Sequence, residues 1–358
     1  MDGIVESSAG RAIRGVERRQ LPVMDVAPVL AGDREGMRRL AIQWRKVSET
    51  VGFLAIVNHG IPKDLVDRMT AQAKAFHDLP HEVKNTIPLS TDQKGFQTSR
   101  VSTVTHSVYS KNRKLDNNEA LVLATDYPAD HPQVKAGKRF YGHNRWLPED
   151  VLPGFRATAT EYMDTMTALG KKLLPLWAMA LELPESFFEP YFKDNYTYFR
   201  VSRYPAKADI EVDEFAISSH ADTGFMTFVP PATEEGIQIM SPEGTWFWPD
   251  FPAEGIILNT GMFLERWSNK RFRATPHRVI PPVKNDRYSL PLFVNPSFDA
   301  VGECLPTCTS ADNPPHFPTQ TYWEFFNWYM ENTFTHYGKL KKTAGDGVEV
   351  PAESTATA

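Results

Sequence analysis

The stretch Ser218-Ser219-His220-Ala221-Asp222-Thr223-Gly224 decides the fold class and the chemistry that we expect of this chain. His220 and Asp222 are two residues apart, so on an extended strand both side chains project to the same side. His277 supplies a second imidazole much later in the chain. Two histidines and one carboxylate on one face, with the opposite face open, are typical of non-haem Fe(II) sites that react with oxygen. The sequence therefore predicts a metal site made of His220, Asp222 and His277.

A second motif, Arg287-Tyr288-Ser289, predicts a binding site for a carboxylate. Arg287 and Ser289 are also two residues apart on a predicted strand, so their side chains point the same way. A guanidinium pairs with a carboxylate through two parallel hydrogen bonds, and a hydroxyl adds a further donor. A carboxylate anchor beside a half-filled metal site implies a co-substrate or substrate that carries a carboxylate.

Composition narrows the class of protein and its partners. The chain has 358 residues, of which 41% are hydrophobic and 23% charged, as in ordinary globular proteins. The net charge of −5 predicts no nucleic-acid partner and no membrane-surface partner, and the apolar run at 173–181 is too short to span a bilayer. The low cysteine count (Cys304 and Cys308) gives no sign of a disulfide scaffold, and the N-terminus has no apolar segment of a secretory signal. A cytoplasmic location is therefore the expectation.

Periodicity divides the first part of the chain. Residues 1–20 lack apolar periodicity and are predicted to be a mobile arm. Residues 21–150 are predicted to be an N-terminal region of one catalytic unit, with an amphipathic helix at 36–51 and a buried strand at 52–58. The polar stretch 98–114 carries little periodicity, which favours long loops that act as a lid.

The second part of the chain, residues 151–342, is predicted to hold the catalytic core. A long helix at 150–182 precedes seven or so short strand-like runs between 196 and 294, separated by proline-rich turns. This spacing indicates a sandwich or barrel, with a jelly roll among the options. An aromatic-rich helix at 319–337 is expected to pack on the outside of the β-core, and residues 343–358 are expected to be disordered.

With these motifs in place, the sequence resembles the isopenicillin-N-synthase-like branch of the Fe(II)/2-oxoglutarate-dependent dioxygenases over nearly everything between residues 21 and 337. It departs from that pattern at Asn259-Thr260-Gly261-Met262, where the family often has an acidic last residue, and at Ser202-Arg203-Tyr204-Pro205, where an asparagine is common in first place. The segments that carry the resemblance are Leu21-Pro22-Val23-Met24-Asp25, Val57-Asn58-His59-Gly60-Ile61-Pro62, Asn144-Arg145-Trp146, Trp267-Ser268-Asn269, His277-Arg278-Val279 and Arg287-Tyr288-Ser289.

The resemblance implies an α+β fold with a mainly β core. That core is a double-stranded β-helix (jelly roll) with an N-terminal helical cover and a C-terminal aromatic-rich helix. It also implies Fe(II), 2-oxoglutarate and O2 as the reactive partners. The enzyme would oxidise a C–H bond of a small, secondary-metabolite substrate by hydroxylation, desaturation or cyclisation, and release succinate and CO2. The residues that it implies are His220, Asp222 and His277 for Fe(II), and Arg287, Ser289 and Tyr204 for 2-oxoglutarate.

Substrate contacts are the least determined part of the sequence. The candidates are Phe293, which matches a position that often lines the pocket, and Gln97, Arg100 and Arg113 in or beside the lid. We expect a small-molecule partner and a monomer or homodimer. One alternative is an Fe(II) oxidase like isopenicillin N synthase, which uses O2 without 2-oxoglutarate and would hold the substrate's own carboxylate on Arg287 and Ser289. The other is a non-catalytic β-barrel binding module, which would lack a ligand or the carboxylate anchor.

Overall fold

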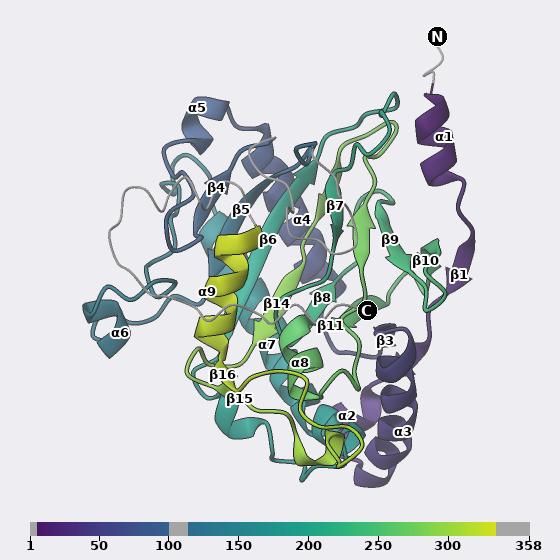
Figure 1. Cartoon of the computed structure of the whole chain (residues 1–358). Helices are drawn as coiled ribbons and strands as arrows, with labels where there is room; N and C mark the ends of the chain where they lie inside the picture. Colours follow the sequence, from purple (N-terminus) through teal and green to yellow (C-terminus); the bar gives the residue numbers. More distant parts are fainter. Residues whose placement is uncertain (1–5, 100–113, 334–358) are drawn as a thin grey trace.

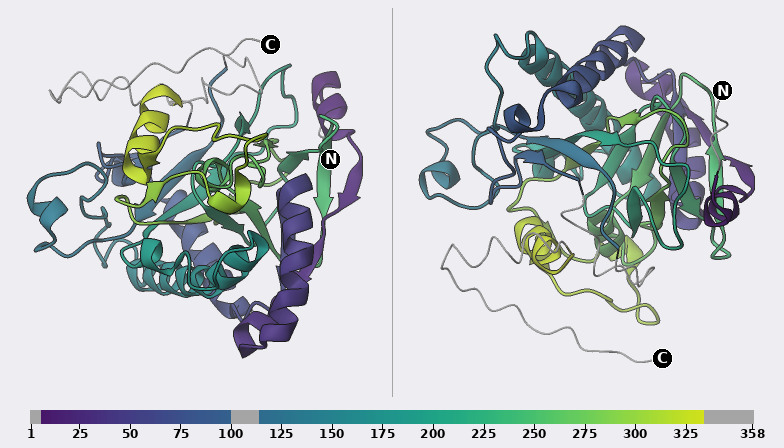
Figure 2. Two further views of the ribbon diagram at one scale, coloured as in Figure 1. Left: turned by 60° about the horizontal axis from the view of Figure 1, so that its bottom comes forward. Right: turned by 90° about the horizontal axis from the view of Figure 1, so that it is seen from above.

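Two β-sheets lie against one another at the centre of the molecule, and long helices cover the larger sheet (Figures 1 and 2). The computed structural model describes residues 6–99 and 114–333. The predicted lid residues 100–113 and the predicted disordered tail 343–358 lie outside the described residues.

The larger sheet is built mainly from antiparallel pairs around β6, and strands from both halves of the chain enter it. The regions 21–150 and 151–342 therefore contribute to the same sheet. In spatial order the strands are β2 (Val23–Asp25), β3 (Phe53–Val57), β11 (Ile256–Thr260), β8 (Met226–Val229), β14 (Leu292–Asn295), β6 (Tyr196–Tyr204), β5 (Glu119–Ala124) and β4 (Gly95–Gln97), with β13 (Arg287–Ser289) also paired to β6.

The smaller sheet contains the strands of the two predicted histidine ligands. Its spatial order is β1 (Arg18–Gln20), β10 (Trp246–Asp250), β9 (Ile237–Met240), β12 (His277–Val279) and β7 (Ile217–His220). β12 and β7 are antiparallel, and His277 stands opposite His220 in the register. Hydrogen bonding between strands that are far apart in the sequence thus brings the two imidazoles together.

Three amphipathic helices, α3 (Arg34–Thr50), α4 (Lys63–Asp78) and α7 (Phe155–Ala180), pack side by side and cover the larger sheet (Figure 2). The apolar stripes of α3 and α7 meet at Trp44 and Trp177, which are fully buried with ring centroids 5.1 Å apart in an edge-to-face contact. The remaining elements are α1 (Ser8–Arg14), α2 (Ala27–Ala31), α5 (His81–Lys84), α6 (Pro132–Lys135), α8 (Met262–Trp267), α9 (Tyr322–Thr333), the 3-10 helices η1 (Glu189–Phe192) and η2 (Pro306–Cys308), and the hairpin strands β15 (Val301–Gly302) and β16 (Gln320–Thr321).

Residues 6–20 correct the prediction of a mobile arm. They form α1 and β1, and β1 pairs in parallel with β10 at the edge of the smaller sheet. Side chains of the sheet hold the backbone of the arm: Gln238 donates to the carbonyl of Ile13 at 2.8 Å, and Trp248 donates to that of Arg14 at 2.9 Å. Apolar periodicity is weak here because main-chain contacts, rather than a continuous apolar face, attach the segment.

Helix α9 also differs from the expectation of an element that packs only on the outside of the core. Tyr322 and Phe325 are buried among other aromatic rings, but Phe326, Tyr329 and Met330 line the central pocket. These five residues recur at steps of three and four and so share one face of the helix, which forms part of the pocket wall.

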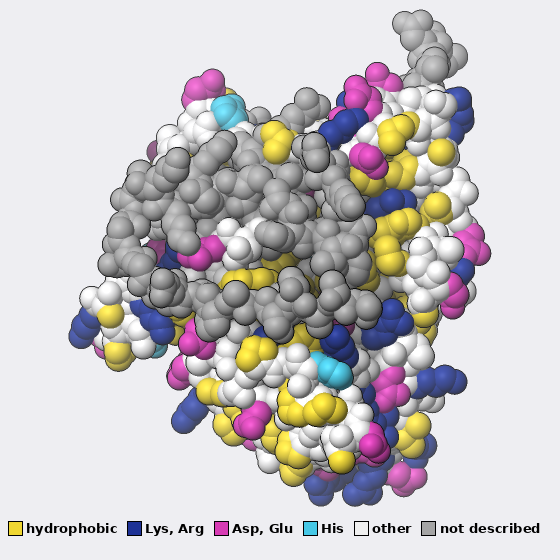
Figure 3. Space-filling model, viewed as in Figure 1, with side chains coloured by type: hydrophobic (Ala, Val, Ile, Leu, Met, Phe, Trp, Pro, Cys, Tyr) yellow, Lys and Arg dark blue, Asp and Glu magenta, His cyan; other side chains and the backbone are white. Residues whose placement is uncertain are grey.

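These arrangements give an α+β double-stranded β-helix, as the motifs implied. Acidic and basic side chains are interspersed over the described part of the face shown in Figure 3. In the part of the chain that the structure describes, no helix is both long and apolar enough to cross a bilayer.

Candidate active site

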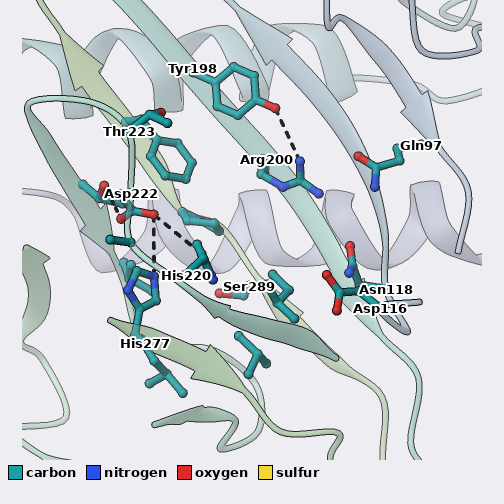
Figure 4. A pocket seen from close by; sticks show the side chains of 18 of the residues that line it. Gln97, Asp116, Asn118, Tyr198, Arg200, His220, Asp222, Thr223, His277 and Ser289 are labelled. Carbon is teal, nitrogen blue, oxygen red and sulfur yellow. Dashed lines mark hydrogen bonds and ion pairs between the residues drawn. The ribbon is translucent and has the colours of Figure 1, made fainter. Parts of the chain in front are cut away.

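His220, Asp222 and His277 meet in a pocket between the two sheets (Figure 4). His220 ends β7, His277 begins β12, and their ring centroids are 4.3 Å apart. Oδ1 of Asp222 lies 3.8 Å from Nε2 of His220 and 3.6 Å from Nε2 of His277. One ligand atom from each residue falls within 4.8 Å of the others, so a single ion can contact all three.

The other sheet fixes the orientation of the Asp222 carboxylate. Thr227 on β8 and Asn259 on β11 both donate to Oδ2, at 2.6 Å and 2.7 Å, which leaves Oδ1 facing the histidines. Burial alone would raise the pKa of Asp222, but the two imidazoles and these hydrogen bonds together hold the pKa below its usual value. Asn259 opens the segment in which the sequence departs from the family at Met262, and its own contact with Asp222 is present.

Hydrogen bonds to backbone carbonyls also orient the histidines. Nδ1 of His220 lies 2.9 Å from the carbonyl of Ser218, and Nδ1 of His277 lies 3.2 Å from that of Thr275. These contacts assign the proton to Nδ1 and leave Nε2 as the metal-binding atom in each ring. Burial and the charge of His277 lower the pKa of His220 to about 4, so its imidazole is neutral at pH 7.

Arg287 lies in the same pocket and is only 3% exposed. It stands opposite Tyr204 in the register of β13 and β6, with its guanidinium 4.9 Å from the centre of the Tyr204 ring. Nε donates to the carbonyl of Glu234 at 3.0 Å, whereas Nη1 is buried with no hydrogen-bond partner among the described residues. Burial lowers the pKa of Arg287. Ser289, two residues on, lines the same pocket.

The residues present therefore fit both the metal and the carboxylate that the sequence implied. Two imidazoles and one carboxylate are the donor set of non-haem Fe(II) oxygenases. A buried guanidinium with an unpaired nitrogen is costly unless an anion completes its hydrogen bonds, and 2-oxoglutarate offers such a carboxylate.

The structure also places the predicted substrate contacts. Gln97 and Phe293 line the pocket, whereas Arg100 and Arg113 lie outside the described residues. Sequence reasoning missed Asp116 and Arg200, which line the pocket as well. Arg200 could have been predicted from the sequence, because it is four residues from Tyr204 on one strand and its side chain therefore points to the same side of β6.

Comparison with known proteins agrees with this geometry. Residues 21–149 match a family model described as the N-terminal region of the non-haem dioxygenase in morphine synthesis. Residues 193–296 match the family model of the 2OG-Fe(II) oxygenase superfamily. The 2-oxoglutarate-Fe(II) type oxidoreductase hxnY of Emericella nidulans is 30% identical over 84% of this chain and 86% of its own length. The chain belongs to the 2OG-Fe(II) oxygenase superfamily.

Other relatives of this 2OG-Fe(II) oxygenase extend the comparison. Kihadalactone A synthase of Citrus sinensis is 33% identical over 75% of this chain and 80% of its own. The solved structure of a Neurospora crassa protein in complex with alpha-KG and thymine has a TM-score of 0.74 at 22% identity. The match covers 90% of this chain and 97% of that one, and it supports the fold.

This oxygenase is a 2-oxoglutarate-dependent dioxygenase that acts on a small molecule. It uses Fe(II), 2-oxoglutarate and O2 to oxidise a C–H bond of that molecule, with release of succinate and CO2.

Proposed function

We propose that His220, Asp222 and His277 bind the Fe(II) of this enzyme, and that Arg287 and Ser289 hold the far carboxylate of 2-oxoglutarate. Tyr204 lies against the Arg287 guanidinium and restricts its position. When bound, the iron and 2-oxoglutarate activate O2 for the oxidation of a substrate C–H bond. The protein's own part is to fix one oxygen of Asp222 through Thr227 and Asn259, so that the other oxygen faces the two histidines.

The observation that carries this proposal is the buried guanidinium of Arg287 in the same pocket as the three candidate ligands. A metal triad alone would suit many reactions. A buried cation with one unpaired nitrogen next to that triad specifies an anionic ligand that reaches from the metal to the arginine. 2-Oxoglutarate, with a carboxylate at each end, has the required chemistry.

We further propose a secondary metabolite as the substrate, and Gln97 and Phe293 as contacts to it. Support comes from their place in the pocket wall and from relatives named as synthases of kihadalactone A and azadirone. A monomer or homodimer in the cytoplasm, with no nucleic-acid partner, completes the proposal. The two free, buried thiols of Cys304 and Cys308 fit a reducing compartment.

Anaerobic titration with Fe(II) and 2-oxoglutarate tests the site. We expect a visible charge-transfer band in the wild type, its loss in His277→Ala, and its retention in the matched control His143→Ala, since His143 is exposed and pairs with Asp126. A folded wild type without the band, or a band that survives in His277→Ala, would contradict the assignment. Oxygen consumption with substrate but without succinate would instead favour the oxidase that uses no 2-oxoglutarate.

A further inference from the structure

Arg200 is a second cation in the active-site pocket, and the roles proposed above do not use it. It lies in β6 on the same side as Tyr198 and Tyr204, and it is half-buried. Its Nη1 donates to the Tyr198 hydroxyl at 3.4 Å, a long contact with a neutral group. Within residues 6–99 and 114–333, no carboxylate lies within 4 Å of its guanidinium.

Arg203 on the same strand provides a comparison. Its guanidinium is 2.7 Å from Asp286 and 3.2 Å from Glu119, so two carboxylates neutralise it, and it does not line the pocket. One strand therefore carries one arginine that the protein pairs itself and one, Arg200, that it leaves facing the cavity. An arginine that faces a cavity without a carboxylate partner can form strong, charge-assisted hydrogen bonds with an anionic ligand.

The groups around Arg200 are polar but do not neutralise it. In Figure 4, Gln97, Asn118 and Asp116 lie on the Arg200 side of the pocket, away from His277. Asn118 donates to the carbonyl of Ala216 at 2.7 Å, while its Oδ1 is buried with no partner among the described residues. This end of the pocket therefore has an amide oxygen, Oδ1 of Asn118, that can accept a hydrogen bond from a ligand.

Asp116 is the carboxylate that could neutralise the charge of Arg200, but it forms its hydrogen bonds with Ser218. One of its oxygens accepts from both the backbone N–H and the hydroxyl of Ser218, at 2.9 Å and 2.6 Å. Burial raises the pKa of Asp116 to about 7, against the hydrogen bonds from Ser218 and the charge of Arg200. Near neutral pH the carboxyl therefore balances only part of the positive charge.

The charges at the iron end already balance without Arg200. Fe(II) and Arg287 are offset by Asp222 and the two carboxylates of 2-oxoglutarate. The positive charge of Arg200 is therefore not neutralised by the metal site or by 2-oxoglutarate, and an anionic substrate could neutralise it. Beside Arg200, Tyr198 and Phe293 stand edge to face with centroids 5.4 Å apart, and Phe326 of α9 adds a third ring. The remaining space combines one cation with an aromatic wall.

We propose that Arg200 binds a carboxylate of the substrate, and that the substrate is a small carboxylic acid with a flat or apolar body. The acid would pair with Arg200, and the body would lie along Tyr198 and Phe293 and direct a C–H bond towards the iron site. This inference rests on the function proposed above, because it takes the Arg287 end to be occupied by 2-oxoglutarate.

Matched probes test it by binding rather than by activity. The enzyme is loaded with Mn(II) in place of Fe(II) and saturated with 2-oxoglutarate, and calorimetry compares benzoate with benzamide and cinnamate with cinnamamide. We expect the wild type to bind the acids about tenfold more tightly than the amides or better, because hydrogen bonds between two ions are the stronger kind. Arg200→Met should abolish the preference and Arg200→Lys should keep part of it. Arg34→Met, which removes an exposed arginine, should leave the preference intact.

Three results would overturn the inference: no preference for the acids in the wild type, a preference that survives in Arg200→Met, or binding of benzoate that weakens as 2-oxoglutarate increases. The last would place the probe on Arg287. Failure of the proposed function is separate, because a wild type that does not bind 2-oxoglutarate at all contradicts the role of Arg287 before any probe is added.

Discussion

Replacing Thr227 by valine should weaken metal binding although Thr227 is not itself a candidate ligand. Valine keeps the shape of the side chain but removes the hydroxyl that donates to Asp222 at 2.6 Å, and leaves Asn259 as the other donor to that oxygen. A buried hydrogen bond to a charged group contributes about 1.5–3 kcal/mol. If this hydrogen bond serves to hold the carboxylate in the orientation that binds metal, its loss should raise the dissociation constant for the metal roughly 10- to 100-fold.

Titration with Mn(II), followed by the resonance signal of the free ion, measures this constant. Thr167→Val is the matched control, because its hydroxyl bonds Thr197 at 2.9 Å and does not touch Asp222. Asn259→Leu should weaken binding to a similar extent, and the double variant should lose less than the sum because both donors share one oxygen. A folded Thr227→Val protein whose metal affinity stays within about twofold of the wild type would refute the reasoning.

Three further outcomes follow from the structure. Arg287→Gln should raise the KM for 2-oxoglutarate about 100-fold in a succinate-release assay with little change in metal affinity, and an unchanged KM would exclude this arginine as the anchor. Burial alone would raise the pKa of Glu119, but His77 and Lys84 together lower it from 4.5 to about 2. The stability that Glu119 contributes is therefore present above pH 4.5 and is lost as the pH falls towards 2. Urea unfolding should therefore show a loss of up to about 3 kcal/mol over this range that Glu119→Gln lacks, and parallel pH profiles would contradict it. Deleting residues 1–20 should lower the melting temperature by several degrees, because it uncovers one edge of the smaller sheet, and an unchanged value would show that the arm is dispensable.

Much of the site could be predicted because its spacing is short. His220 with Asp222, and Arg287 with Ser289, are pairs two residues apart, and alternation along a strand is a local property that the sequence records directly. His277 entered the prediction only as a second imidazole, since no local pattern shows that β12 will lie beside β7 with His277 opposite His220. Long-range pairing is a property of the whole sheet.

The remainder was hidden for identifiable reasons. β5 is buried on both faces and follows a polar stretch, so its residues show no alternation. β10 contains Pro249, a residue type that usually indicates a turn; the strand tolerates it beside β1 near the edge of the sheet. Asp116 gave no signal because it precedes β5 in an irregular segment, and its role depends on Ser218 from a distant strand.

The position of β7 would couple metal binding to the stability of the smaller sheet. Within the described residues, β7 is an edge strand that pairs only with β12, and the register shifts between His277 and Val279. An ion bound by both His220 and His277 would hold these two strands together. Metal binding would then stabilise the pairing of β7 with β12, and loss of the metal would weaken it. An ion present at 100 times its dissociation constant adds about 2.7 kcal/mol to folding stability. Without the ion, β7 would separate from β12 more readily, and local opening of this kind exposes a chain to proteolysis. The metal would then contribute to the stability of this enzyme as well as to its activity.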